Sequence, residues 1–133
     1  MILLDTHVWI WWISNIEKFP QKALRYINKA RGKNSIIISS ISTWEIALLV
    51  ERGRLDLSID VRDWVRKTEG LEFVRFMPVD NTISLRSVSL PGEFHADPAD
   101  RIITATAMTM GIPLITRNEK ILGYPHVRTI WAE

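Results

Sequence analysis

Residues 1–7 read Met-Ile-Leu-Leu-Asp-Thr-His, and residues 36–38 read Ile-Ile-Ile. Both segments contain a short, unbroken apolar run, which is typical of a strand buried on both faces of a parallel sheet. The second run consists only of β-branched side chains, which favour strands. Because helix-like segments follow these runs, the sequence predicts an α/β fold with a mainly parallel sheet.

Apolar strands and helix-like segments continue to alternate along the rest of the chain. Pro20 and Gly32 bracket one expected helix, and Pro98 and Gly111 bracket another. The expected helices span residues 21–31, 44–50, 60–69, 81–89 and 98–110, with a short helical turn at 116–122. The further expected strands span residues 73–79, 112–115 and 127–131.

Composition limits the classes of protein that fit. The chain has 133 residues, which predicts a single domain over residues 1–133. The formal net charge is only +2, so any contact with nucleic acid has to come from a local basic patch. The absence of cysteine excludes disulfides and thiolate zinc sites and agrees with a cytoplasmic location. The longest apolar run, residues 8–13, is too short to cross a membrane, and we expect no signal peptide.

Four carboxylates lie where strands end or helices begin. Asp5 ends the first strand, Glu45 falls in the first turn of the helix after the second strand, and Asp97 and Asp100 lie at the start of helix 98–110. Ligands of open α/β sheets bind beyond the carboxyl ends of the strands, so these side chains are expected to converge. Clustered carboxylates repel one another unless a divalent cation neutralises them. The cluster therefore predicts metal-dependent phosphodiester chemistry.

Helix capping is an alternative role for most of these acids. Residues 42–45 and 116–119 both match the capping box, in which Ser or Thr is followed three residues later by Glu. Asp97 fits an N-cap, and Asp100 suits the first turn of the same helix. Asp5 is different, because a carboxylate directly after three apolar strand residues is costly if it is buried unpaired. We therefore interpret Asp5 as functional, while capping and metal binding remain compatible for the others.

Four blocks of sequence together resemble the PIN domain, and in particular the VapC-like toxins of bacterial and archaeal toxin–antitoxin pairs. The blocks are residues 1–7 (MILLDTH), 39–46 (SSISTWEI), 95–107 (HADPADRIITATA) and 114–118 (LITRN). They occur in the family's order between residues 1 and 118, and with the matching total length the resemblance extends over essentially the whole chain. The resemblance implies a three-layer α/β/α sandwich with a central, mainly parallel sheet.

The resemblance also implies an activity and partners. It implies an endoribonuclease that depends on Mg²⁺ or Mn²⁺ and acts on RNA as the toxin of a toxin–antitoxin pair. A cognate antitoxin protein and a second copy of the chain, in a homodimer, are the implied protein partners, in the cytoplasm and without a membrane. The RNA target and the cleavage sequence stay open.

The family's site residues map onto this chain one by one. Its catalytic acids fall on Asp5, Glu45 and Asp100. These three acids are expected to bind the metal together with Asp97, which lies at the edge of the site. Thr6, Thr116 and Asn118 are expected to orient water or phosphate. Arg101 and Arg117 lie beside the acids in sequence and can bind flanking phosphates or form ion pairs, and for Arg101 we expect the ion pair.

Position 118 departs from the family pattern. The family often has a fourth acid after the strand that ends at Ile115, where this chain has Asn118. A carboxamide oxygen is a weaker ligand for a hard cation than a carboxylate is. The site is therefore expected to be weakened, and the number of metal ions stays open.

Trp9, Trp11 and Trp12 form an unusual aromatic cluster. In a helix Trp9 and Trp12 share a face, whereas Trp11 points away from it. We interpret two of them as core residues and one as partly exposed. The alternative is a tryptophan exposed for a partner such as an antitoxin.

Two other functions remain open. The first is a PIN-like fold retained only for binding, with Asn118 as a trace of lost catalysis, against which the intact Asp5, Glu45 and Asp100 argue. The second is a phosphatase of the haloacid-dehalogenase kind, which also begins with a strand ending in Asp. That chemistry requires a second Asp two residues later, and this chain has His7 there.

Overall fold

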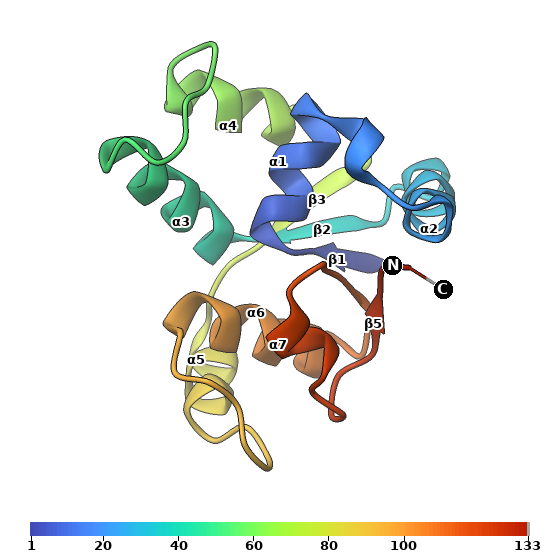
Figure 1. Cartoon of the computed structure of the whole chain (residues 1–133), viewed down its shortest axis with the longest axis vertical. Coiled ribbons are helices and arrows are strands. Elements are labelled where there is room, and N and C mark those ends of the chain that lie inside the picture. The colour runs from blue at the N-terminus through green and yellow to red at the C-terminus, as the bar shows by residue number, and fades with distance from the viewer. Residues whose placement is uncertain (133) are drawn as a thin grey trace.

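The structure is a computed structural model that describes residues 1–132, and its centre is a parallel sheet (Figure 1). The strands are β1 (Ile2–Leu4), β2 (Ile36–Ser39), β3 (Val74–Met77), β4 (Leu114–Ile115) and β5 (Thr129–Ile130). Their spatial order is β3-β2-β1-β4-β5, and every neighbouring pair is parallel. The prediction of an α/β fold with a parallel sheet is confirmed.

Helices cover both faces of this sheet. They are α1 (Thr6–Ser14), α2 (Gln21–Gly32), α3 (Ser40–Glu51), α4 (Val61–Glu69), α5 (Asn81–Val88), α6 (Pro98–Met110) and α7 (Glu119–Leu122), with a 3₁₀-helix η1 (Ile16–Lys18) after α1. Figure 1 shows α1 and α2 on one side of the sheet and α5, α6 and α7 on the other. This arrangement is the expected three-layer α/β/α sandwich.

Alternate residues of β1 supply the two layers of core. Leu4 lies in the cluster that contains Trp9 of α1, whereas Leu3 lies in the cluster that contains Ile103 of α6. Both leucines are fully buried, as the unbroken apolar run predicted. The central strand is therefore covered on both faces, and only its carboxyl end is left to carry a polar side chain.

The strand register fixes where that polar side chain lies. Leu4 of β1 pairs with Ile38 of β2 on one side and with Ile115 of β4 on the other. The residue that follows each of these three is polar: Asp5 follows Leu4, Ser39 follows Ile38 and Thr116 follows Ile115. Because parallel strands end at the same edge, the sheet presents Asp5 between two hydroxyl residues.

The caps at the start of α3 differ from the prediction. Helix α3 begins at Ser40, directly after β2, and its N-cap is Ser39, whose Oγ accepts from the Ile41 amide over 3.1 Å. The predicted capping box at residues 42–45 is therefore wrong, because the strand enters the helix without a loop. Glu45 lies in the second turn of α3, not the first.

The caps of α6 and α7 give one confirmed and one wrong prediction. Asp97 is the N-cap of α6, as predicted: its Oδ2 accepts from the Asp100 amide over 2.9 Å. Gly111 ends α6 in the left-handed region, at φ 65°, which glycine adopts without strain. The predicted capping box at residues 116–119 is wrong, because α7 begins at Glu119 and its N-cap is Asn118.

The tryptophans of α1 differ in burial. Trp9 is fully buried against Trp64 and Phe76, and its Nε1 donates to Oγ1 of Thr68 over 3.1 Å. Trp12 and Trp11 are both partly exposed. The expectation of two core tryptophans therefore holds fully for Trp9 only.

No helix within residues 1–132 is long and apolar enough to cross a membrane.

Candidate active site

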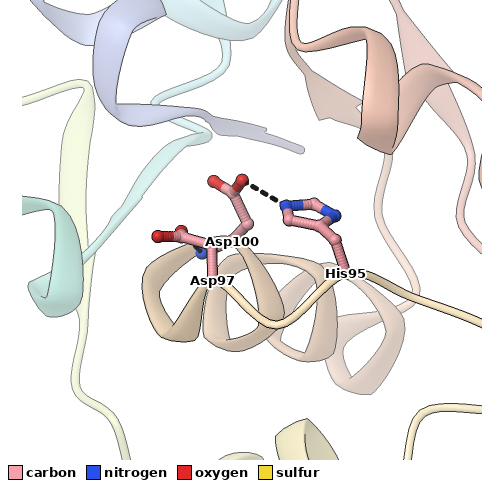
Figure 2. A group of neighbouring side chains, drawn as sticks. All are labelled: His95, Asp97 and Asp100. Carbon is pink, nitrogen blue, oxygen red and sulfur yellow. Dashed lines mark hydrogen bonds and ion pairs between the residues drawn. The ribbon is translucent and has the colours of Figure 1, made fainter.

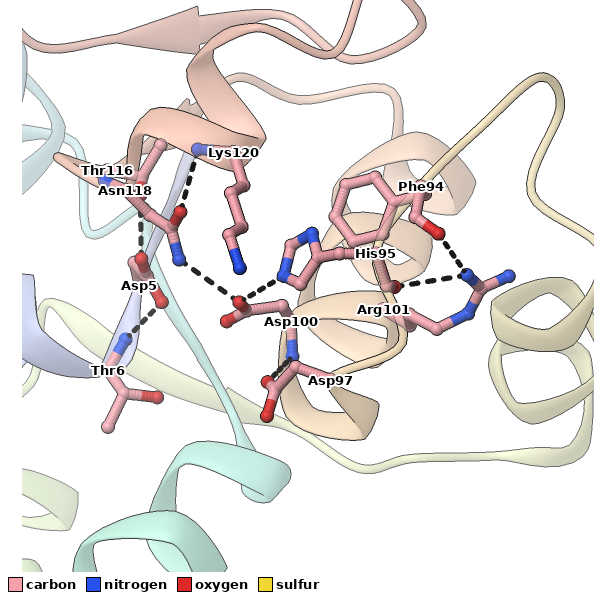
Figure 3. A network of polar contacts seen from close by, with 10 residues as sticks. All are labelled: Asp5, Thr6, Phe94, His95, Asp97, Asp100, Arg101, Thr116, Asn118 and Lys120. Atoms are coloured by element: carbon pink, nitrogen blue, oxygen red, sulfur yellow. Dashed lines mark hydrogen bonds and ion pairs between the residues drawn. The ribbon is translucent and has the colours of Figure 1, made fainter.

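Asp5 is the most buried acid of the site, with 5% of its surface exposed. Its Oδ1 accepts from the Thr6 amide over 2.8 Å, which makes Asp5 the N-cap of α1. Its Oδ2 accepts from the Thr116 hydroxyl over 2.6 Å. Both carboxylate oxygens are thus oriented by neighbours on β1–α1 and at the end of β4 (Figure 3).

The four predicted acids lie around one open cavity of about 520 Å³. The residues that line it are Asp5, His7, Val8, Trp11, Glu45, Asp97, Asp100, Arg117 and Asn118. They come from the end of β1 and from α1, from α3, from the start of α6 and from the segment after β4. The convergence expected from strand ends and helix starts is therefore present.

Thr6 and Thr116, predicted to orient water or phosphate, do not line this cavity. Both side chains are fully buried. Thr116 donates to Asp5, and the Thr6 hydroxyl donates to Oγ of Ser42 over 2.8 Å. These threonines contact the groups behind the cavity, so they orient the acids themselves.

Asp100 forms the most extensive polar contacts of the cavity (Figures 2 and 3). Its Oδ2 lies 2.7 Å from Nε2 of His95 and accepts from Nδ2 of Asn118 over 3.0 Å. His95 therefore holds the Asp100 carboxylate through its ring nitrogen. Ligand atoms of His95, Asp97 and Asp100 all lie within 4.8 Å of one another, close enough to share a metal ion.

The electrostatics of the cavity disfavour three ionised carboxylates. The pKa values of Asp5, Glu45 and Asp100 are all raised above their ordinary values, and burial is the main cause for each. Repulsion adds to it, because Asp100 raises the pKa of Asp5 and Asp5 raises that of Glu45. Within residues 1–132, no lysine or arginine forms an ion pair with these acids. The residues therefore fit a divalent cation, which supplies the missing positive charge.

The two arginines beside the acids behave differently from each other. Arg101 forms no ion pair with any residue from 1 to 132, so that prediction is wrong: its guanidinium donates to the backbone carbonyls of Ser87 at 2.8 Å, of Phe94 at 3.0 Å and of His95 at 3.2 Å. Its five donors suit several carbonyl groups better than one carboxylate. Arg117 lines the cavity and lies over the ring of Trp11.

Sequence reasoning missed several contributors to the site, among them Trp11 and Ser42. Trp11 lines the cavity, and Ser42 accepts from the Thr6 hydroxyl behind it. Ser42 is a buried polar residue in a helix, and only its place four residues after Ile38 links it to the sheet edge. Trp11 carries a sequence signal, because it lies on the opposite face of α1 from the core residue Trp9.

Comparisons with known proteins give the family. Residues 2–126 match the PIN domain. The ribonuclease VapC22 of Mycobacterium tuberculosis is 33% identical over 132 residues, which covers 98% of each chain. Two solved structures share the fold. One is VapBC2 from Rickettsia felis bound to a promoter DNA fragment, with a TM-score of 0.72 and 19% identity, covering 98% of this chain and 99% of that one. The other is DNA-bound VapBC from Salmonella typhimurium, with a TM-score of 0.69 and 20% identity, covering 97% and 96%. This chain belongs to the PIN domain family.

Proposed function

We propose that this chain is the ribonuclease toxin of a toxin–antitoxin pair and that it hydrolyses RNA phosphodiester bonds in the acidic cavity. The observation that carries the proposal is the convergence of Asp5, Glu45, Asp97 and Asp100 around one cavity without a lysine or arginine counterion among residues 1–132. The likeness to a named ribonuclease over nearly the whole chain supports the same activity.

The cofactor of the proposed reaction is Mg²⁺ or Mn²⁺. Asp5, Glu45 and Asp100 are the proposed catalytic acids, and Asp97 completes the metal-binding set. When it is bound, such a cation supplies an activated water and stabilises the charge that develops on the phosphate. The raised pKa values of three of these acids support the need for added positive charge.

The surrounding residues have supporting roles in this proposal. Thr116 and the Thr6 amide fix the two oxygens of Asp5. The Thr6 side chain also lowers the pKa of Glu45, against the effect of burial. Asn118 fixes Asp100. Arg117, at the rim of the cavity, contacts a phosphate of the RNA next to the one that is cut.

The proposed partners follow from the solved relatives. Those structures are toxin–antitoxin assemblies, which supports a cognate antitoxin protein as the partner of this chain. We further propose that residues 1–133 form a single domain, that it is a homodimer and that it acts in the cytoplasm.

The test is cleavage of a broad RNA panel by the purified chain with Mn²⁺, with Mg²⁺ and with a chelator. The matched variants are Asp5→Asn and Asp63→Asn, because Asp63 is an exposed acid of α4 outside the cavity. We expect metal-dependent cleavage by the wild type and by Asp63→Asn, and none by Asp5→Asn. Cleavage that persists in Asp5→Asn contradicts the proposed site. Absence of cleavage combined with retained antitoxin binding indicates a binding-only PIN fold.

A further inference from the structure

Trp11 contributes an aromatic side chain to the lining of the acidic cavity. The centroid of its indole ring lies 4.9 Å from Nζ of Lys18 and 5.4 Å from Cζ of Arg117. Both distances are within the about 6 Å over which a cation is attracted to an aromatic face. Two basic side chains, one after α1 and one after β4, are therefore held on a single ring.

Trp11 is itself supported by other aromatic side chains. Its ring centroid lies 6.1 Å from that of Trp131, which in turn lies 5.3 Å from that of the buried Phe19. Tryptophan has only two side-chain torsions, so such packing restrains the ring at little cost in conformational entropy. The indole is thus a fixed surface on which the longer, flexible cationic side chains rest.

The position of Arg117 is informative because acids are close by. Arg117 directly follows Thr116, which binds Asp5, and it lines the same cavity as the four carboxylates. It nevertheless forms no ion pair with them within residues 1–132. Its guanidinium lies against the indole instead. This contact leaves the carboxylates free for a metal ion and leaves the guanidinium donors free for an anion.

We propose that Trp11 is a positioning residue that holds Arg117 and Lys18 as a phosphate-binding pair for the RNA phosphates next to the one that is cut. This inference rests on the proposed ribonuclease function. An RNA strand that crosses the cavity presents one phosphate to the acids and the neighbouring phosphates to Arg117 and Lys18. Trp11 acts through the two cations, and it is the cations that contact RNA.

RNA binding tests this role without relying on cleavage. The Asp5→Asn variant is titrated with a labelled single-stranded RNA at several salt concentrations, and fluorescence anisotropy gives the affinity. For a single strand, each lost phosphate contact reduces the magnitude of the negative slope of log K against log salt by about 0.7. We expect Trp11→Leu to weaken binding about 3- to 10-fold and to reduce this slope, whereas Trp11→Phe, which keeps an aromatic face, recovers most of the affinity.

Trp12→Leu is the matched control. Trp12 neighbours Trp11 on α1 but packs against Phe73 and does not line the cavity. The Trp12→Leu variant is expected to leave both the affinity for RNA and the salt dependence of binding unchanged. Calorimetry with Mn²⁺ on the wild type and on Trp11→Leu checks that the acids are intact, and thermal unfolding checks that each variant folds.

A variant that lacks both cations separates positioning from direct contact. In the background of Lys18→Gln with Arg117→Gln, Trp11→Leu is expected to cause no further loss of affinity. A further loss means that the indole contacts RNA itself and overturns the positioning role. An unchanged salt slope in Trp11→Leu, or no RNA binding by Asp5→Asn at all, also overturns it. If the wild type binds RNA but cuts none with any metal, the ribonuclease proposal fails while the result for Trp11 still stands.

Discussion

Nδ2 of Asn118 donates a hydrogen bond of 3.0 Å to Oδ2 of Asp100, the same oxygen that lies 2.7 Å from Nε2 of His95. The orientation of the Asn118 amide is fixed by its other end, because Oδ1 accepts from the Lys120 amide over 2.9 Å as the N-cap of α7. Asn118 therefore presents a nitrogen to the acids and no oxygen ligand. Where a fourth acid would add negative charge, this chain has a donor that stabilises Asp100.

The first prediction concerns Asn118→Asp. Aspartate keeps the N-cap, but it places a second carboxylate oxygen about 3 Å from Asp100 in place of a donor. We expect the metal-free variant to lose about 1–2 kcal/mol of unfolding free energy at neutral pH, and Mn²⁺ to stabilise it more than it stabilises the wild type. Thermal unfolding with a chelator and with a Mn²⁺ series measures both effects.

Asn118→Ser is the control for this substitution. Serine keeps a capping oxygen but lacks both the amide donor and the added charge. It is expected to lose stability without gaining a larger response to Mn²⁺. If Asn118→Asp shows the same Mn²⁺ response as the wild type, the side chain at position 118 does not face the metal site.

The second prediction is the pH dependence of the metal-free protein. Burial raises the pKa of Asp5 above its ordinary value of 3.8, so the folded state binds this proton more tightly than the unfolded state does. Asp5 therefore favours folding at a pH below its unfolded pKa, and this contribution is lost as the pH rises through the folded pKa. We expect Asp5→Asn to be more stable than the wild type by at least about 1 kcal/mol at neutral pH. The difference is expected to shrink toward pH about 4.

Thermal unfolding of both proteins between pH about 4 and 8, with a chelator, measures this difference. Burial is the main cause that raises the pKa of Glu45 and that of Asp100, and it persists in both proteins, so the difference between them reports Asp5 together with its repulsion of Glu45. Added Mn²⁺ is expected to stabilise the wild type and to have little effect on Asp5→Asn. A difference in stability between the two proteins that does not change with pH contradicts the raised pKa of the buried Asp5 carboxyl.

The fold class and the acids of the site could be predicted from the sequence because both depend on local chemistry. Unbroken apolar runs indicate buried parallel strands, and Asp5 stands out because it directly follows the first of them. The proline and glycine at the ends of α6 gave its bounds correctly. Each of these signals requires only the identities of neighbouring residues.

Contacts between distant segments were not predictable in this way. The start of α3 was placed too late because the hydroxyl of Ser39 caps the helix directly at the strand end. Arg101 was expected to pair with an acid, but the carbonyls that it binds come from α5 and from the segment before α6, and their orientation depends on the tertiary fold. The pairing of Trp11 with Arg117 likewise joins residues over 100 positions apart.

The third prediction concerns Arg101→Lys. The Arg101 guanidinium connects the end of α5, through Ser87, with the segment that carries His95. A lysine ammonium cannot span several carbonyls, so we expect a loss of about 1–3 kcal/mol and faster amide hydrogen exchange in residues 89–97. RNA cleavage is expected to fall because His95 no longer holds Asp100. Arg86→Lys is the control, because the Arg86 side chain makes a single, long hydrogen bond of 3.4 Å, to Thr109, in the described part of the chain. Equal exchange in both variants contradicts this role.

The last prediction concerns Thr104, which is fully buried in α6 one turn after Asp100. Its Oγ1 has no hydrogen-bond partner among the described residues, and a buried polar atom without a partner costs about 1–3 kcal/mol. Thr104→Val keeps the shape of the side chain and removes that atom, so we expect it to raise the melting temperature by about 4 °C. Thr106→Val is the matched control, since Thr106 is equally buried and its Oγ1 donates to the Ile102 carbonyl over 2.7 Å. It is expected to leave the melting temperature unchanged or slightly lower. If Thr104→Val is the less stable of the two, the Thr104 hydroxyl binds an ordered water behind the acids, and its loss should then also reduce RNA cleavage.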